Sequence, residues 1–295
     1  MQERQLGKTG YKPKIISLGG ESLLKGSSPE EHAEARKLIH RALDLGVNYV
    51  DTAPTYDDSE IRIGEVIADG RRDEFYLATK TDKRTARDAF VQLTDSLRRL
   101  QTDRLDCWQL HHLDEFSELD EIFGPGGAIE AVDRAKKSGI IRFAGITGHS
   151  DPAVLEEALK RYPFDQVLMA LNAADKHINS FQETLLPLCV KMGVGIVAMK
   201  TFSRGAMFAA PLTAEDCLRW VMGLPVSTII TGVSNVEQLE RNISIGDMPP
   251  MEKEEMASFE AACEPHAAEM LFFRKDGSAN WDAYKDIHVL PQQVL

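Results

Sequence analysis

The fold is decided by residues 48–80, which read NYVDTAPTYDDSEIRIGEVIADGRRDEFYLATK. Two short apolar segments, 48–51 and 75–80, have the length and the β-branched and aromatic content of buried strands. The residues between them, about 59–67, show the apolar spacing of an amphipathic helix. A strand, a crossover helix and a second strand form a βαβ unit, whose two strands lie parallel. This stretch therefore predicts a parallel sheet of the α/β class, covered by helices.

The same rhythm of a short strand followed by a helix continues in both directions from this unit. Strands are expected at residues 15–18, 48–51, 75–80, 106–111, 141–147, 164–171, 193–200 and 227–231. Helices are expected at about 29–45, 59–67, 85–100 and 236–245, with one ending at Ser138 and one starting at the cap Ser150-Asp151-Pro152. A longer loop containing residues 123–127 follows the fourth strand. Eight units without a long linker favour a closed (β/α)8 barrel, the TIM barrel, over an open doubly wound sheet.

Both ends of the chain lie outside the eight units. Residues 4–14 are expected to form a hairpin around Gly7-Lys8-Thr9-Gly10 that plugs the bottom of the barrel. The barrel then spans about residues 15–245, followed by a helix at 251–264 and an irregular tail. Residues 1–295 fit a single domain, because barrels of this type commonly need about 250 residues or more.

The composition limits the classes of partner and the compartment. A net charge of −12 argues against nucleic acid, because phosphate backbones are bound by clustered Lys and Arg side chains. No apolar segment reaches the roughly 20 residues that cross a membrane, and the first residues carry no signal segment. Cys107, Cys189, Cys217 and Cys263 are scattered without metal-ligand spacing. We therefore expect a cytoplasmic protein with buried free thiols and no bound metal.

Four titratable side chains are expected to meet at one mouth of the barrel. The active sites of such barrels lie at the carboxyl ends of the strands. The second strand ends in Asp51, the third in Lys80 and the fourth in His111, and Tyr56 lies in the loop after the second strand. Taken singly, Asp51 could cap a turn and Lys80 could lie on the surface. Tyr56 and His111 could each be packing residues, so the prediction depends on the four occurring together.

The same residues carry a resemblance to a known family. Residues 51–56, Asp-Thr-Ala-Pro-Thr-Tyr, resemble the Asp-Thr-Ala-x-x-Tyr signature of the aldo-keto reductases. Residues 6–10 are similar to the family's opening segment, residues 106–111 to its Asp-x-Tyr-x-x-His segment, and Lys80 to its lysine. The similarity spans about residues 3–245. It implies an NAD(P)H-dependent oxidoreductase that reduces an aldehyde or ketone to an alcohol, with Tyr56 as proton donor.

The chemistry gives a reason for this set of residues. A free tyrosine has a pKa of about 10, which is too high for efficient proton transfer at neutral pH. The ammonium of Lys80 is expected to lower the pKa of Tyr56, and Asp51 to hold Lys80 in place. His111 would hydrogen-bond the substrate carbonyl and orient it, or help to relay the proton.

The loops after the seventh and eighth strands offer a place for a phosphorylated cofactor, as in other barrels. Lys200 and Arg204 follow the seventh strand and supply local positive charge in an acidic protein. Ser234 and Asn235 lead into a helix after the eighth strand, although either could be an ordinary helix cap. By resemblance to the family, the residues expected at the cofactor are Gly19, Gly20, Thr147, Asn172, Met199, Lys200, Thr201, Phe202, Arg204, Gly232, Ser234, Asn235, Gln238, Arg241 and Asn242.

Three positions depart from the family pattern where it holds the nicotinamide. Gly148 replaces an amide side chain after the fifth strand, Leu168 replaces a glutamine of the sixth, and Met199 replaces an aromatic residue after the seventh. His149 could substitute for the lost amide, and the Met199 thioether can pack on a ring. A Met-Lys pair at this place occurs in one branch of the family. The C-terminal iron–sulfur cysteines of some members are absent, because the tail holds only Cys263.

Family habit alone favours NADPH, with NADH possible. The positions where many members of the family carry Lys and Arg for the 2′-phosphate are Gly232 and Gln238 here, and Arg241 could compensate. The substrate pocket is expected to contain Glu21 and His112. Other expected pocket residues are Leu23, Leu24, Phe116, Phe272, Phe273 and Trp281. This mixture fits aromatic aldehydes, sugars or steroids, and Glu21 and His112 slightly favour a polar substrate.

Two other classes of function stay open on the sequence alone. The first is a nicotinamide-binding regulatory protein that senses redox state with slow or no turnover, like the potassium-channel β subunits of the family. The second is an unrelated barrel lyase with Lys80 as a Schiff base, against which the neighbouring Asp51 and Tyr56 argue. A monomer is compatible with the sequence.

Overall fold

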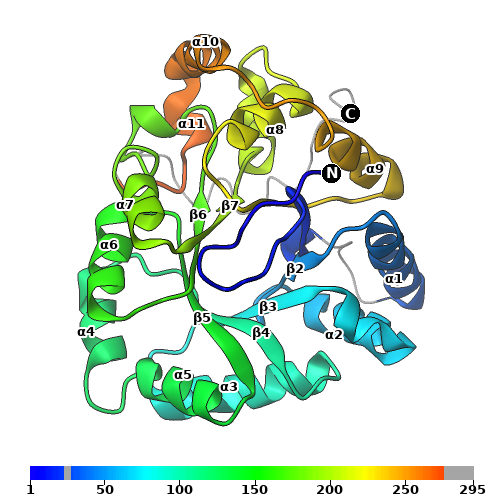
Figure 1. Cartoon of the computed structure of the whole chain (residues 1–295), viewed down its shortest axis with the longest axis vertical. Helices are drawn as coiled ribbons and strands as arrows, with labels where there is room; N and C mark the ends of the chain where they lie inside the picture. Colours follow the sequence, from blue (N-terminus) through cyan, green and yellow to red (C-terminus); the bar gives the residue numbers. More distant parts are fainter. Residues whose placement is uncertain (23–27, 276–295) are drawn as a thin grey trace.

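The computed structural model describes residues 1–22 and 28–275, and in this part eight parallel strands close into a barrel (Figure 1). Neighbouring strands follow the chain order, and β8 pairs with β1 to close the ring. The strands are β1 Ile16–Gly19, β2 Tyr49–Asp51, β3 Tyr76–Thr81, β4 Leu105–Leu110, β5 Ile141–Gly148, β6 Gln166–Ala170, β7 Gly195–Met199 and β8 Thr228–Thr231. The predicted (β/α)8 barrel is confirmed, and every observed strand overlaps the range expected for it.

Helices surround the barrel (Figure 1). They are α1 Pro29–Asp44, α2 Ser59–Val66, α3 Ala86–Arg99, α4 Phe116–Phe123, α5 Ala128–Lys137, α6 Pro152–Arg161, α7 Leu185–Met192, α8 Ala214–Met222, α9 Val236–Ile245, α10 Lys253–Cys263 and α11 Ala267–Met270. Local signals explain where several of them begin. Ser28 and Glu31 form a capping box at α1, and the Asp151 side chain accepts a hydrogen bond from the Ala153 amide at α6.

Four of these helices were not predicted: the four-residue α11, in the tail expected to be irregular, and three others. Helix α4 occupies part of the segment expected to be a loop, and α7 and α8 lie between predicted strands. Each has only eight or nine residues. So few residues give little apolar periodicity, and packing decides the conformation; α4, for example, buries Leu119 and Ile122.

Residues 4–14 form the predicted hairpin, which crosses the middle of the ring of helices (Figure 1). The Leu6 amide donates to the Tyr11 carbonyl at 2.9 Å, and the Leu6 side chain is fully buried. Gly7 has a φ of +51°, and an added Cβ would lie 2.7 Å from the backbone carbon of Val194. The guanidinium of Arg4 donates to three carbonyls between α8 and β8. The hairpin is therefore fixed to the barrel bottom by packing and by hydrogen bonds.

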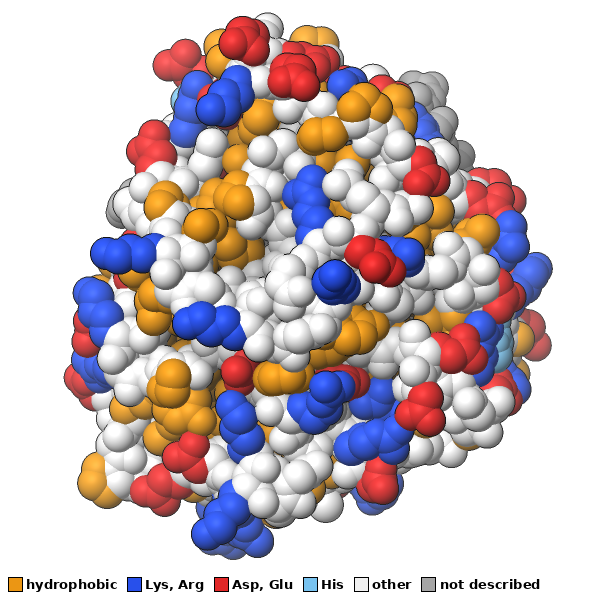
Figure 2. Space-filling view, in the orientation of Figure 1, with side chains coloured by type: hydrophobic (Ala, Val, Ile, Leu, Met, Phe, Trp, Pro, Cys, Tyr) orange, Lys and Arg blue, Asp and Glu red, His pale blue; other side chains and the backbone are white. Residues whose placement is uncertain are grey.

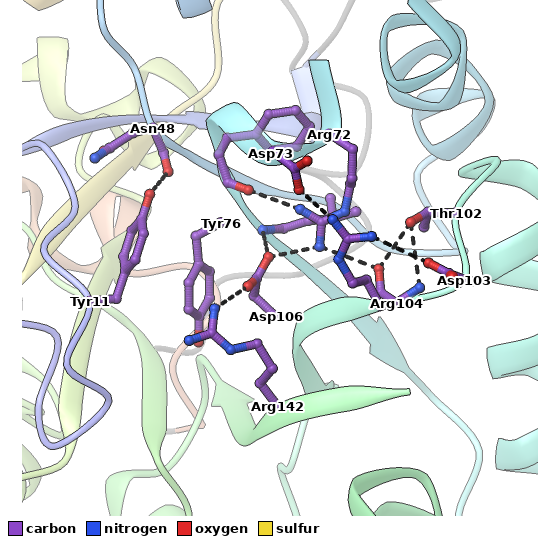
Figure 3. Close-up of polar contacts among 12 residues, drawn as sticks. Tyr11, Asn48, Arg72, Asp73, Tyr76, Thr102, Asp103, Arg104, Asp106 and Arg142 are labelled. Atoms are coloured by element: carbon purple, nitrogen blue, oxygen red, sulfur yellow. Dashed lines mark hydrogen bonds and ion pairs between the residues drawn. The ribbon is translucent and has the colours of Figure 1, made fainter. Parts of the chain in front are cut away.

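A cluster of ion pairs lies at the bottom of the barrel, around Asp106 (Figure 3). Its carboxylate accepts hydrogen bonds from Arg72 and Arg142, both at 2.8 Å, and from the Leu77 amide at 3.0 Å. Asp106 is the second residue of β4, whereas His111 follows the other end of that strand. Residues 106–111, which resemble a segment of the aldo-keto reductases, thus contain a structural carboxylate at the bottom of the barrel and a site residue at the top.

The surface and the helices bear on the classes of partner. On the face seen in Figure 2, basic and acidic side chains are interspersed rather than gathered by sign. None of the helices in residues 1–22 and 28–275 is both long and apolar enough to span a bilayer. All four cysteines are buried free thiols. The predicted state of the thiols is therefore confirmed.

Candidate active site

The structure brings the four expected catalytic residues to one mouth of the barrel. Asp51 is the last residue of β2, Lys80 lies one residue before the end of β3, and His111 directly follows β4. Tyr56 lies in the turn between β2 and α2. Because β2 pairs with β3 and β3 with β4, three adjacent strands carry the set.

Asp51 and Lys80 form a fully buried ion pair. The Lys80 ammonium donates to Asp51 Oδ1 and, at 2.7 Å, to the carbonyl oxygen of Thr52. The second carboxylate oxygen, Oδ2, accepts from Gln109 Nε2 at 2.7 Å. Burial raises the pKa of Asp51, and the opposing effects of Lys80 and Gln109 favour its charged form. Both oxygens of the carboxylate are therefore used in fixing its position.

Tyr56 lies against both Lys80 and His111. The Lys80 nitrogen is 4.7 Å from the centroid of the Tyr56 ring, and the imidazole of His111 meets that ring edge-on at 5.9 Å. Burial raises the pKa of Tyr56 well above its ordinary value, and Glu21 and Asp51 add to the effect. The expected lowering of this pKa is therefore wrong for the structure. The physical reason is the burial of the phenol, to which the charges of Glu21 and Asp51 add, while Lys80 directs its hydrogen bonds to Asp51 and Thr52.

His111 is a neutral imidazole at one end of a row of three histidines, in which His112 lies between His111 and His149. Burial lowers its pKa well below the ordinary value, and His112 and Lys80 lower it further. Within the described residues, His111 Nδ1 is buried without a hydrogen-bond partner. The rings of His111 and His112 are 3.9 Å apart, and those of His112 and His149 are 4.7 Å apart. A neutral ring suits the expected role as a hydrogen-bond partner of a carbonyl better than a role as a cationic acid.

Glu21 contacts the two cations that were expected to hold the cofactor. It lies in the single turn η1 Gly20–Ser22, and its carboxylate accepts from Lys200 Nζ at 2.8 Å and from the Arg204 guanidinium. Burial opposes its charge, but the two cations outweigh burial and lower the pKa of Glu21. Lys200 and Arg204 have positive φ values of 57° and 53°. The loop after β7 thus holds two cations in uncommon backbone conformations around one anion.

The residues expected near the adenosine surround the start of α9. The side chain of Asn235 caps this helix by accepting from the Gln238 amide at 2.8 Å, and Gln238 Oε1 accepts from the Ser234 amide at 2.9 Å. Ser234 and Asn235 are exposed, Gln238, Arg241 and Gly232 are partly exposed, and Asn242 is buried. The alternative of a helix cap is therefore confirmed for Asn235, whose neighbours still leave an accessible helix amino terminus.

Two of the residues expected near the nicotinamide, Thr147 and Asn172, have hydrogen-bond partners within the protein. Thr147 Oγ1 accepts from the His112 amide at 3.1 Å. The Asn172 amide group donates to the Lys200 carbonyl at 3.3 Å and accepts from the Ala174 amide at 3.0 Å. The remaining expected residues lie at the same end of the barrel: Gly19 ends β1 and Gly20 follows it, and Met199 ends β7, with Thr201 and Phe202 in the loop that follows. Thr201 Oγ1 is buried without a hydrogen-bond partner among the described residues.

A cavity of about 480 Å³ lies next to His112, whose ring is 3.9 Å from that of His111. It is lined by His112, Asp114, His149, Ser150, Phe272, Phe273 and Arg274. His112, Phe272 and Phe273 therefore border a cavity as expected, whereas Glu21 is tied to the cations and Phe116 is exposed. Leu23, Leu24 and Trp281 lie outside the described residues.

Gln109 and Arg274 are two site residues that the sequence reading missed. Gln109 lies in β4, two residues before His111, which directly follows that strand, and alternate residues of an extended chain face the same side. A polar residue in phase with His111 was therefore an available signal. Arg274 forms a fully buried ion pair with Asp175 and donates to the His149 carbonyl at 2.6 Å. No local sequence pattern predicts the ion pair of Arg274 and Asp175, because the two residues lie far apart in the chain.

Replacing Glu21 with glutamine is expected to strengthen NADPH binding by about two- to fivefold. The amide keeps the size of the side chain but frees Lys200 and Arg204 for the phosphates of the cofactor. The dissociation constant is measured by quenching of protein fluorescence. Glu74→Gln, at an exposed ion pair with Arg71 at the barrel bottom, makes the same change in charge and should have no effect. Weaker binding in Glu21→Gln would mean that Glu21 supports the cofactor instead.

The family model for the aldo/keto reductase family matches residues 15–216. The chain therefore belongs to this family of oxidoreductases, which carry out NAD(P)H-dependent reduction of small carbonyl compounds. It shares 26% identity with L-galactose dehydrogenase of Arabidopsis thaliana, over 89% of this chain and 94% of that protein. It shares 29% identity with 6-dehydroglucose reductase of Novosphingobium aromaticivorans, over 72% of each protein. Nothing in these comparisons favours the regulatory alternative.

Solved structures show the same architecture. The holo form of an aldo-keto reductase from Bacillus halodurans, AKR11C1, superposes with a TM-score of 0.74 at 26% identity, covering 98% of this chain and 100% of that one. An aldo-keto reductase from Klebsiella pneumoniae in complex with NADPH shares the fold, with a TM-score of 0.71 at 20% identity, covering 90% and 96%.

Proposed function

We propose that this protein is an NADPH-dependent reductase of small hydroxylated aldehydes or ketones, with Tyr56 as the proton donor. The observation that carries the proposal is the meeting of Tyr56, Lys80, Asp51 and His111 at one mouth of the barrel. The cofactor, when bound, supplies the hydride that reduces the carbonyl carbon. The protein must then orient the carbonyl and deliver a proton to its oxygen.

Tyr56 and His111 divide these two tasks. An alkoxide oxygen is a far stronger base than a phenolate, so a phenol with a raised pKa still protonates it readily. His111, as a neutral imidazole, donates or accepts one hydrogen bond per nitrogen and can orient the carbonyl oxygen. Lys80 and Asp51 form a buried ion pair, which places the Lys80 cation against the Tyr56 ring.

The charges after β7 support the cofactor part of the proposal. Lys200 and Arg204 bind the carboxylate of Glu21, and two cations gathered on one anion support a role in binding phosphate. In the cofactor-bound protein these cations would bind the phosphates, and the hydroxyl of Thr201 has a free hydrogen-bonding capacity beside them. Gln238 and Arg241 would contact the adenosine end, where the cation of Arg241 favours NADPH over NADH. Met199-Lys200 supports assignment to the Met-Lys branch without the iron–sulfur cysteines.

The cavity next to His112 supports a hydroxylated substrate. His112, Asp114 and His149 offer hydrogen-bonding groups, and Phe272 and Phe273 offer aromatic faces. A sugar presents the same two kinds of surface, hydroxyl groups at its edge and C–H groups on its face. Two relatives are named for reactions on sugars or sugar derivatives, which agrees with this combination.

Oxidation of NADPH in the presence of a panel of carbonyl compounds tests the proposal. The panel contains hydroxylated aldehydes of three to six carbons and apolar aldehydes of equal size. We expect the hydroxylated compounds to give the higher kcat/KM. Tight NADPH binding without turnover on any member of the panel would contradict the proposal and favour the regulatory alternative. Four buried free thiols support a reducing, cytoplasmic compartment for this activity.

A further inference from the structure

A chain of hydrogen-bonded polar side chains runs through the interior of the barrel. It consists of Asp51, Gln109, Gln166, Tyr76 and Tyr49, which we call the polar file. Gln109 Nε2 donates to Asp51 Oδ2 at 2.7 Å, and Gln166 Nε2 donates to Gln109 Oε1 at 3.2 Å and to the Tyr49 hydroxyl at 3.0 Å. All five side chains are at most 1% exposed. The interiors of such barrels are usually filled with branched apolar side chains, so the presence of these polar side chains requires a structural or functional explanation.

The direction of each hydrogen bond follows from Asp51, because an ionised carboxylate only accepts. Gln109 must turn its NH2 group to Asp51 and its carbonyl oxygen to Gln166. Gln166 must then present its own NH2 group to Gln109, which leaves its carbonyl oxygen to accept from the Tyr76 hydroxyl at 3.1 Å. The hydrogen bonds from Tyr76 through both glutamines to Asp51 therefore run in one direction, and bonds aligned in this way strengthen one another.

The strands provide the space that the polar file needs. Gly145 on β5 lies between the two glutamines, and an added Cβ would be 2.9 Å from the Cγ atoms of both Gln109 and Gln166. Below them, the rings of Tyr49 and Tyr76 stack at 5.0 Å with an angle of 12°. The two glutamines thus pack so closely against Gly145 that a side chain at this position would displace them.

We propose that Gln109 is a positioning residue, which holds the Asp51 carboxylate in its pairing with Lys80 and is itself oriented by Gln166 and Tyr76. The inference rests on the proposed function for its kinetic consequences. It requires no contact between Gln109 and the substrate, since Gln109 acts through Asp51. Removing the amide should leave Asp51 paired with Lys80 but without the donor at Oδ2.

Titratable groups from every element around Asp51 bear on the expected pH dependence. They are Lys80 on β3, Cys107 on β4, Tyr49 on β2, Glu21 in η1 and Tyr56 in the turn after β2. Burial raises the pKa values of Tyr49, Tyr56 and Cys107, so these groups stay neutral near neutral pH. Burial and Glu21 raise the pKa of Asp51, whereas Lys80 and Gln109 oppose the rise. Loss of Gln109 must therefore raise the pKa of Asp51 further.

The kinetic test is Gln109→Met, which keeps an unbranched side chain of similar length but removes the amide. The acidic limb of the pH profile of kcat should move upward by about one to two pH units, because Asp51 takes up its proton at higher pH. At alkaline pH, kcat should return to within about twofold of the wild type. Gln166→Met, one link further away, should move the limb in the same direction by less. A kcat lowered by one factor at every pH would contradict the proposal.

Unfolding of the cofactor-free protein gives a second readout. Asp51 has a folded pKa raised above 3.8, so its stabilising effect is present below that pH and is lost as the pH rises through the folded value. Gln109→Met is expected to raise the folded pKa of Asp51 further, so that the pH range over which this stabilisation is lost extends to higher pH. The loss of stability relative to the wild type should therefore grow only as the pH rises from the wild-type folded pKa of Asp51, which lies above 3.8, to the still higher folded pKa of the variant, and should be constant outside that range.

Ser17→Ala is the matched control for both readouts. Ser17 is also buried on a barrel strand, but it pairs with Thr228 at 2.6 Å rather than with Asp51. Its destabilisation should be the same at every pH. A pH-independent loss in Gln109→Met as well would overturn the proposal. If the wild type reduces no carbonyl, the proposed function fails, and the unfolding measurement still decides the role of Gln109.

Discussion

Tyr56→Phe is expected to lower kcat for carbonyl reduction by about 10²- to 10⁴-fold, the usual contribution of a positioned general acid. The phenyl ring keeps the contacts of Tyr56 with the Lys80 cation at 4.7 Å and with the edge of His111. Only the proton donor is removed, so the dissociation constant for NADPH should stay within about twofold. Steady-state kinetics and a fluorescence titration measure the two effects separately.

Tyr162→Phe is the matched control for this prediction. The Tyr162 hydroxyl donates to Asp133 at 2.7 Å, at the end of α6 and away from the tetrad. The same chemical change there should leave kcat unaltered. If Tyr56→Phe retained the wild-type rate, another group would be the proton donor and the assignment of Tyr56 would be wrong.

Lys80→Met is expected to damage both the activity and the fold. Both side chains of the Lys80–Asp51 pair are at most 1% exposed, so the variant leaves a buried carboxylate without its cation. Breaking a buried pair in this way typically costs about 3–5 kcal/mol of unfolding free energy. Activity should fall strongly as well, because Asp51 and the Tyr56 ring both lose their contact with the Lys80 ammonium.

A double variant separates the two effects of Lys80. Lys80→Met with Asp51→Asn removes the unpaired charge, so it should recover much of the unfolding free energy measured in denaturant. It should not recover kcat, because the cation beside Tyr56 is still missing. Recovery of activity together with stability would show that Lys80 has only a structural role in the folded protein.

The architecture and the catalytic set follow from local sequence patterns. Short apolar strands alternating with helices predicted the closed barrel. Polar residues at the ends of three strands predicted the meeting of Asp51, Lys80 and His111, because parallel strands bring their carboxyl ends to one mouth. These features depend on periodicity and on strand order, which can be read from neighbouring residues.

The features that could not be predicted depend on contacts between distant parts of the chain. Glu21 follows β1, and only the closed barrel brings it to Lys200 and Arg204 after β7. The pKa of Tyr56 depends on its burial and on where Lys80 directs its hydrogen bonds, which no motif records. The role of Gln109 could be predicted only in part. Its position two residues before His111 indicates a side chain that faces the same side as His111, but not that this side chain hydrogen-bonds Asp51.

The transfer of deuterium from C4 of NADPH to the product tests the central claim most directly. The protein is incubated with a hydroxylated aldehyde and NADPH deuterated on the transferring face of C4, and the alcohol is analysed by mass spectrometry and NMR. The account predicts one deuterium on the carbinol carbon for each NADPH oxidised. An alcohol without deuterium, or a substrate adduct trapped on Lys80 by borohydride, would contradict it.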